Sequence, residues 1–211
     1  YDAAGELPAP GTASGKTGSP RKKTAGSSIP FLVQVTDKYW NLVVSSEAKV
    51  SITDTDDNNY DISKDTDAVF AGSTTISRIF ITADPLGFSV SATGQGAYPN
   101  ASNPSSKVPI LSQDANRLLL LLPGETRKQG KYLTEPKGKS GLPDYQLAGF
   151  SFTVTAYGVD QYYNTDPAAV FSVDVDIATD KYDVNPSSRN LTAGATTFVF
   201  TPVTAATHTV K

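Results

Sequence analysis

The sequence AGSSIPFLVQVTDKYWN, residues 25–41, occurs a second time in related form as AGFSFTVTAYGVDQYYN, residues 148–164. Each copy has an Ala-Gly pair, then apolar residues at alternate positions, then Asp and Asn four residues apart. Apolar residues at alternate positions are typical of a half-buried β-strand. Asp and Asn favour a tight turn because their side chains bond to the neighbouring backbone. Each copy therefore predicts a strand that ends in a turn.

Further matches extend the repeat along the chain. GKTGSP at 15–20 returns as GKSGLP at 138–143, with the same offset of 123 residues that separates position 25 from position 148. AGSTT at 71–75 returns as AGATT at 193–197. Repetition at a nearly fixed period indicates that one structural unit is present twice.

The two copies differ at their ends. RLLLLLPGET, residues 117–126, opens the second copy, and the first copy begins just after the counterpart of these leucines. The second copy stops at Lys211, before the counterpart of the last strand expected in the first. We predict one domain over residues 1–112 and a second, truncated before its last strand, over residues 113–211.

Composition favours an all-β fold. The chain has 16 Gly and 14 Pro, many β-branched and aromatic residues, and no sustained i, i+3, i+4, i+7 apolar pattern of a helix. Its net charge of -3 gives no electrostatic reason to bind nucleic acid. Membrane insertion is not expected either, because the leucine run is far shorter than the roughly 20 apolar residues that a spanning helix needs.

Short apolar runs separated by Gly, Pro, Asn and Asp predict an antiparallel β-sandwich in each copy. In the first copy the expected strands are 30–36, 47–53, 60–62, 74–82, 87–93 and 107–111. In the second copy they are 117–122, 150–158, 169–177, 182–184, 195–201 and 206–210.

The run AG-x(4)-F-x-V-x-V-x-D-x-x-x-N, the later V-x-I-T and AG-x-T-T, and the opening L-L-L-P-G-E-T and G-K-x-G-x-P resemble bacterial immunoglobulin-like repeats. Such modules stand in tandem in invasin- and intimin-like proteins and in other large surface proteins. The resemblance covers essentially the whole chain. It implies two tandem immunoglobulin-like antiparallel β-sandwich domains and an extracellular or cell-surface location.

The aromatic residues inside the Asp-x-x-x-Asn motifs are candidate interface residues: Tyr39, Trp40, Tyr162 and Tyr163. The favoured interpretation is that they belong to the turn and lie over the end of the sandwich. The sharper alternative is an exposed aromatic patch that stacks on a glycan.

Acidic side chains near the ends of strands suggest a calcium site, since calcium takes six to eight oxygen ligands. The candidates are Asp54, Asp56, Asp61, Asp174, Asp176 and Asp183. Their spacing lacks the pattern of a dedicated calcium loop, and solvated carboxylates are the favoured interpretation. No other cofactor is expected.

The leucine run is predicted to be the first strand of the second domain. Alternate side chains of a strand point to opposite faces, so one set of leucines enters the core and the other needs a separate cover. We expect Leu119 and Leu121 to be covered by the preceding module or a neighbouring subunit, which makes them interface candidates.

An enzyme is not expected, because His208 is the single histidine and no motif places a nucleophile or a second base beside it. The expected function is that of non-enzymatic structural repeats of a large extracellular protein, stalk or filament. Assembly head to tail by strand addition would join these repeats to neighbouring repeats or to copies of the chain. The alternative is an adhesin module that binds a glycan or a surface protein of a host or neighbouring cell.

Overall fold

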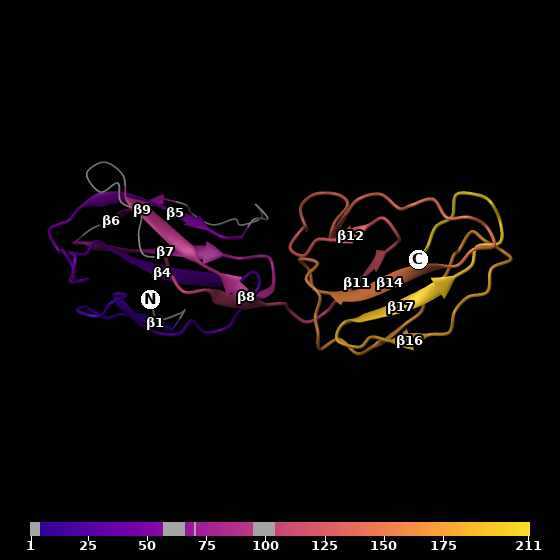
Figure 1. Cartoon of the computed structure of the whole chain (residues 1–211), viewed down its shortest axis with the longest axis horizontal. Helices are drawn as coiled ribbons and strands as arrows, with labels where there is room; N and C mark the ends of the chain where they lie inside the picture. The colour runs from indigo at the N-terminus through magenta and orange to yellow at the C-terminus, as the bar shows by residue number, and fades with distance from the viewer. Residues whose placement is uncertain (1–4, 57–65, 70, 95–103) are drawn as a thin grey trace. The chain divides into compact units, whose positions relative to one another are not determined.

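The computed structural model describes residues 5–56, 66–69, 71–94 and 104–211. The chain forms two compact units, Tyr1–Leu111 (unit 1) and Ser112–Lys211 (unit 2), drawn from indigo to magenta and from rose through orange to yellow in Figure 1. All helical or strand structure within those ranges is strand, which confirms the all-β prediction. Over the same ranges, no helix is long and apolar enough to cross a membrane.

Ten strands are described in unit 1. They are β1 (Glu6–Pro8), β2 (Lys16–Gly18), β3 (Lys23–Thr24), β4 (Ser28–Gln34), β5 (Ala48–Asp54), β6 (Thr66–Val69), β7 (Ser73–Ile79), β8 (Asp84–Phe88), β9 (Val90–Gly94) and β10 (Val108–Leu111).

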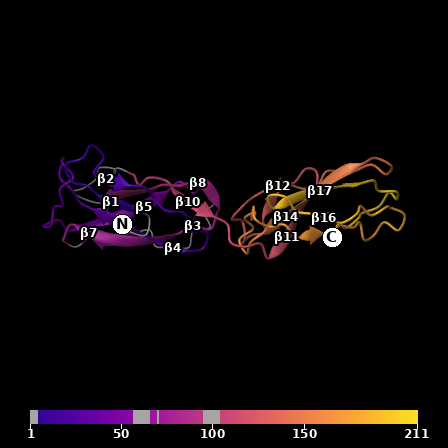
Figure 2. The same cartoon turned by 90° about the horizontal axis from the view of Figure 1, so that it is seen from below.

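These strands form small sheets around an apolar core. β4 pairs with β7, β5 lies between β6 and β9, and β10 lies between β3 and β8. β1 and β2 form a separate hairpin, labelled in Figure 2. Every pairing is antiparallel except that of β10 with β3. The alternation of β4 places Ile29 and Phe31 in the core, where the ring of Phe31 meets the edge of Phe80.

Unit 2 has seven strands. They are β11 (Arg117–Leu121), β12 (Thr126–Arg127), β13 (Lys139–Ser140), β14 (Phe152–Val159), β15 (Ser172–Val173), β16 (Arg189–Asn190) and β17 (Ala195–Phe200).

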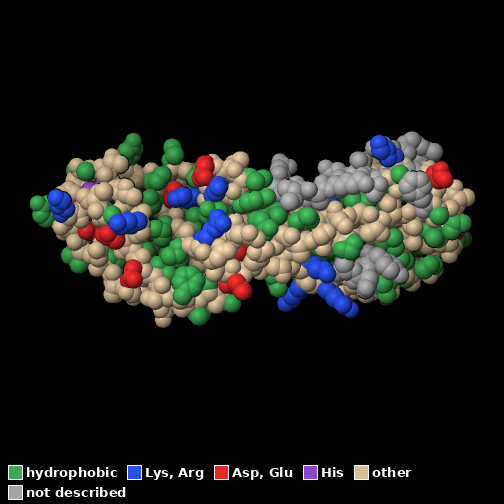
Figure 3. All heavy atoms as spheres, turned by 180° about the vertical axis from the view of Figure 1, so that it is seen from behind, with side chains coloured by type: hydrophobic (Ala, Val, Ile, Leu, Met, Phe, Trp, Pro, Cys, Tyr) green, Lys and Arg blue, Asp and Glu red, His purple; other side chains and the backbone are tan. Residues whose placement is uncertain are grey.

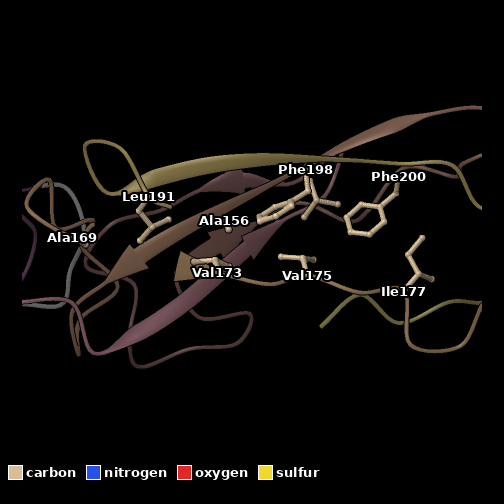
Figure 4. Close-up of a cluster of buried hydrophobic side chains, with 9 residues drawn as sticks. Ala156, Ala169, Val173, Val175, Ile177, Leu191, Phe198 and Phe200 are labelled. Carbon is tan, nitrogen blue, oxygen red and sulfur yellow. The ribbon is translucent and has the colours of Figure 1, made fainter. Parts of the chain in front are cut away.

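The main sheet of unit 2 is antiparallel, with β14 between β11 and β17. One face of this sheet packs on a buried apolar cluster that includes Val154, Phe198 and Phe200. Figure 4 shows this cluster, with side chains from β14 and β17 facing Val173, Val175 and Ile177. Alternate residues of β17 are buried, as expected for a sheet with one face in the core.

The two units pair their strands in the same register. Ile29 lies opposite Arg78 in unit 1, and Phe152 lies opposite Phe200 in unit 2. These positions correspond in the sequence, at offsets of 123 (29 to 152) and 122 (78 to 200). Residues matched in this way are called counterparts below; the offset is 119 at Glu6, 123 or 122 further along, and 120 at Val90.

Some expected strands are wrong. Residues 182–184 form no strand, 206–210 contain only one isolated bridge at Val210, and 169–177 contain only β15 and a bridge at Ile177. A segment becomes a strand only where a neighbour pairs with consecutive residues, and alternation alone does not supply that neighbour. The expected strand at 60–62 lies outside the described residues.

Candidate functional site

The Asp37–Asn41 motif forms a closed turn in unit 1. The carboxylate of Asp37 accepts the N–H groups of Tyr39 at 2.8 Å and Asn41 at 2.9 Å, and the Asn41 amide donates to its second oxygen at 3.0 Å. The side-chain and backbone bonds from Asn41 lower the pKa of Asp37 from its ordinary value. The two residues therefore act as turn formers, as the sequence predicts.

The Asp160–Asn164 motif repeats this turn in unit 2 with the same atoms and nearly the same distances. Here Asp160 and Asn164 are fully buried, whereas Asp37 is exposed. The second carboxylate oxygen of Asp160 also accepts the N–H of Gln113 at 3.0 Å. The turn in unit 2 therefore also holds the segment that leads into β11.

Two of the candidate aromatics are structural. Trp40 and Tyr163 have positive φ angles of 67° and 65°. Their rings lie on Gly15 and Gly138, where any Cβ would come closer than 3.0 Å to the ring. The glycine of each GK motif therefore leaves the space in which the aromatic ring of the turn packs.

The other two candidate aromatics differ between the units. Tyr162 packs edge to face on Tyr132, with ring centres 5.1 Å apart, and burial raises its pKa. Tyr39 stays 59% exposed, and the ammonium of Lys38 lies 4.8 Å from the centre of its ring. Of the four aromatic candidates, Tyr39 is the most open to a partner.

Leu119 and Leu121 lie in a buried cluster within unit 2, and the expected cover by another module or subunit is wrong. They form this cluster with Val159, and Tyr157 and Tyr163 pack against it. Leu118 is 45% exposed, whereas Leu120 and Leu122 pack on the main core. The signal missed in the sequence is that β14 also carries apolar residues on its second face, so β11 and β14 supply this cluster together.

A Glu–Lys pair holds the leucine strand by its backbone. Lys139 donates to the carbonyl of Leu120 at 3.2 Å, and Glu125 accepts the N–H of Leu122 at 2.9 Å. The two side chains also meet in an ion pair of 2.8 Å. We call this pair the Glu–Lys clamp of unit 2.

The clamp recurs in unit 1 with a different occupant. Glu6 and Lys16 are the counterparts of Glu125 and Lys139, and they form a looser ion pair of 3.7 Å. Glu6 accepts the N–H of Ser106 at 3.0 Å, and Lys16 donates to the carbonyl of Pro104. The clamp therefore binds two backbone groups two residues apart in each unit. The recurring GE and GK dipeptides were the available signal for it.

The acidic candidates do not converge on a cation. Asp54 pairs with Arg78, Asp56 donates its N–H to Asp54, and Asp174 accepts the hydroxyl of Ser188. The backbone of Asp176 pairs with that of Lys211. Over the part of the chain that the structure describes, no group of three metal-ligating residues is present. Asp61 lies outside that part.

Asp183 and His208 lie near the same end of unit 2. Burial and the charges of Asp180 and Asp176 raise the pKa of Asp183. One ring nitrogen of His208 donates to the carbonyl of Thr204 at 2.8 Å and lies 3.9 Å from Asp180. Its other nitrogen is 3.1 Å from the hydroxyl of Thr179. The polar contacts of His208 therefore fasten the segment that contains Thr204.

An open edge distinguishes unit 2 from unit 1. In unit 1, β10 pairs with β3, and the N–H of Ala25 donates to the carbonyl of Leu111 at 2.8 Å. The counterparts of β3 and Ala25 are residues 146–148, which belong to no strand and are exposed. We call residues 146–148 the open edge.

Large apolar side chains surround the open edge. Leu142, Tyr145, Leu147 and Phe150 are each at least two-thirds exposed. Their counterparts in unit 1 are all polar: Ser19, Lys22, Thr24 and Ser27. In Figure 3, hydrophobic side chains in green reach the surface on the face of unit 2 that is seen. These four residues were not predicted from the sequence, although the change from polar to apolar between the copies was visible.

No protein-family model, curated protein or solved structure matches the chain.

Proposed function

We propose that the chain consists of two immunoglobulin-like β-sandwich repeats that serve as non-enzymatic structural modules of a large extracellular protein, stalk or filament. The observation that carries this proposal is how the recurring residues are used. The Asp–Asn turn, the aromatic seated on glycine and the Glu–Lys clamp occur in both units, and all of them make contacts inside their own unit. Residues repeated for catalysis or for a ligand would instead leave polar groups directed at a binding site.

The same contacts suit a module that bears tension. The clamp and the Asp160 turn fasten both ends of β11, through Leu120 and Leu122 at one end and Gln113 before the other. A strand fastened at both ends has to break several hydrogen bonds together before it is pulled away. We infer that each unit unfolds as one event under force.

Single-molecule pulling of the whole chain tests this role. We expect two separate unfolding events, each releasing about 35 nm, which is about 100 residues at roughly 3.5 Å per residue. The variant Phe198→Ala should lower the force of one event and leave the other unchanged, because Phe198 is buried in the core of unit 2 alone. A chain that extends without discrete events would contradict the role as a load-bearing module.

Adhesion is the second candidate, and the exposed ring of Tyr39 beside Lys38 favours it. An exposed aromatic at the tip of a turn can stack on a sugar ring. Binding of the chain to a glycan array, lost in Tyr39→Ala and kept in Tyr162→Ala, would support adhesion. If no glycan on the array binds the chain, adhesion to glycans is contradicted and the structural role remains as the proposal.

A further inference from the structure

We propose that unit 1 binds the surface of an anionic phospholipid bilayer through the sheet formed by β3, β10 and β8. Four cationic side chains at one edge of this sheet contact the lipid headgroups, and two exposed leucines of the same sheet enter the headgroup layer. The cations are Arg21, Lys22, Lys23 and Lys107, and we call them the basic edge. This inference goes beyond the proposed structural role and does not depend on it.

The pairing of β10 with β3 brings the basic edge together, although Lys107 is far from the other cations in the sequence. The two strands are parallel, with Ile110 opposite Lys23. Lys107 lies three residues before Ile110, next to the segment that leads into β3. Neighbouring strands are about 4.8 Å apart, so the Cα atoms of Lys107 and Lys22 lie within roughly 10 Å of each other. Figure 3 shows a group of Lys and Arg side chains, in blue, on unit 1.

Acidic neighbours do not neutralise the charge of the basic edge. Within the described ranges, none of its four side chains is in an ion pair, and all but Lys23 are exposed. Glu6 on β1 is engaged in its ion pair with Lys16. The carboxylate of Asp84 on β8 accepts the N–H of Leu86 at 2.8 Å. Positive charge gathered at one place on a chain of net charge -3 attracts an anionic partner and orients the chain towards it.

Protection of the sheet edge does not account for this cluster. β3 is an edge strand, and a lysine such as Lys23 discourages such a strand from pairing with another chain. Lys107, however, precedes β10, which is the central strand of the sheet. The counterparts of residues 21–23 in unit 2 are residues 144–146, Asp-Tyr-Gln, which contain no cation. The fold therefore does not require positive charge at this position.

Two exposed leucines distinguish a lipid surface from a soluble polyanion. Val108 and Ile110 of β10 are fully buried, and Leu111, which follows them in the alternation, is 39% exposed. Leu86 lies in β8 on the other side of β10 and is 78% exposed. A bilayer surface offers phosphates to the cations and an apolar layer to the leucines, whereas a soluble polyanion offers only charge.

A nucleic acid fits this surface less well than a bilayer. Proteins that bind single strands stack the bases on exposed aromatic side chains. All residues of β3, β8 and β10 are described, and their single aromatic residue is Phe88, which is buried and stacks on Phe80. The combination of cations with leucines and no exposed ring therefore favours lipid.

Co-sedimentation of the full chain with vesicles tests the proposal. We expect binding to vesicles of phosphatidylcholine and phosphatidylglycerol in equal amounts, and binding at least about tenfold weaker to vesicles of phosphatidylcholine alone. Added salt should weaken the binding, because it screens the exposed cations. Equal binding to the two kinds of vesicle, or no binding to either, would overturn the proposal.

A matched pair of charge variants locates the contact. Lys22→Glu, Lys107→Glu should bind the mixed vesicles at least about tenfold more weakly. The control Lys128→Glu, Lys181→Glu changes the net charge equally at two exposed positions of unit 2 and should keep most of the binding. All four side chains are exposed, so the melting temperatures should stay close to that of the parent chain. Equal losses in the two variants would show that overall charge, and not the basic edge, governs binding.

The variant Leu86→Ser decides between lipid and the other anionic partners. It should weaken binding to mixed vesicles at least about threefold, because the leucine no longer enters the headgroup layer. Its binding to polyphosphate, a soluble polyanion, should be unchanged. If vesicle binding is also unchanged, the basic edge recognises charge alone and the assignment to lipid is wrong. Tighter binding to a single-stranded oligonucleotide than to the vesicles would likewise overturn it.

Discussion

One pair of counterpart positions carries opposite chemistry in the two units. In unit 1, Arg78 and Asp54 form a buried ion pair in which both side chains are 6% exposed. In unit 2, the counterparts of these residues are Phe200 and Ile177, which pack in the buried apolar cluster (Figure 4). The strand registers around the two pairs agree, with Asp54 opposite Val90 and Ile177 opposite Val210.

This position therefore requires filled volume and not a particular interaction. A buried ion pair loses hydration on both partners, and its mutual attraction does little more than offset that cost. An apolar pair of similar volume avoids the cost. The fold therefore accepts both solutions, provided that the two partners match.

Removal of one partner of the Arg78–Asp54 pair in unit 1 should lower the free energy of unfolding more than any other change proposed here. Either Arg78→Phe or Asp54→Ile alone leaves a buried charge without its partner and should lower the free energy of unfolding by about 3–5 kcal/mol. The double variant reproduces the apolar pair of unit 2 and should recover most of the loss. Denaturant unfolding of the four chains measures the coupling, and a double variant as unstable as the sum of the singles would contradict the comparison.

The outer face of the main sheet is the second contrast between the units. In unit 2, Tyr157 and Val159 cover Leu119 and Leu121, whereas the counterparts of Tyr157 and Val159 in unit 1 are Gln34 and Thr36. Leu119→Ala or Leu121→Ala should cost about 2–5 kcal/mol, the usual range for a buried leucine.

The control for this prediction lies on the same strand. Leu118→Ala should cost well under 1 kcal/mol, because Leu118 is exposed and away from both clusters. Urea unfolding followed by the near-ultraviolet signal of Tyr157 and Tyr163 would measure all three variants. If Leu118→Ala and Leu119→Ala lowered the free energy of unfolding equally, burial in the cluster of Leu119, Leu121 and Val159 would not account for the loss.

Both units pack an aromatic ring against a glycine, and substitution of these glycines tests this shared contact. Gly15 and Gly138 have φ angles of 71° and 70°, and an added Cβ would collide with Trp40 or Tyr163. Gly15→Ala and Gly138→Ala should each cost about 1–2 kcal/mol from backbone strain, with a further cost from displacing the ring. Thermal unfolding would measure both, and Gly11→Ala, where nothing lies within 4 Å, reports the strain alone.

Acid should weaken unit 2 through Asp180, with the smallest effect of the series. Burial raises the pKa of Asp180, but the N–H groups of Thr204, Val203 and Tyr182 outweigh it and lower the pKa from 3.8 to about 2. Because the folded pKa lies below the unfolded value, the stability from this group is present above pH 3.8 and is lost as the pH falls towards about 2.

The pKa of Asp183 is shifted in the opposite direction from that of Asp180, so Asp183 serves as the comparison. Its pKa is raised, so its contribution is lost as the pH rises through the folded value, and Asp183→Asn should stabilise unit 2 at neutral pH. Asp180→Asn should flatten the acid limb of the melting temperature measured against pH. An unchanged acid limb in Asp180→Asn would show that other carboxylates dominate.

The sequence predicted much of the framework because its strongest signals are local. Alternation placed β4, β7, β14 and β17 within a few residues, and the Asp–Asn spacing predicted both turns. The short strands β1, β2, β3, β6, β12, β13 and β16 were missed, because two to four residues carry no clear period and depend on a partner elsewhere in the chain. The expected strand at 206–210 failed for the same reason.

The cover of the leucines depended on contacts that spacing cannot reveal. The strand period of two separated Leu119 and Leu121 from their neighbours, but it could not show that Tyr157, Val159 and Tyr163 lie over them. The exposure of residues 146–148 was missed for a related reason, since exposure depends on contacts with residues that are distant in the sequence.

The repeat, the all-β class and the two Asp–Asn turns could be read from the sequence, because alternation and turn chemistry act between residues close along the chain. The tertiary structure was needed to show which leucines are buried and what the Glu–Lys clamp holds. These properties depend on contacts between residues that are far apart in sequence, such as Leu120 and Lys139, and such contacts have no period to read.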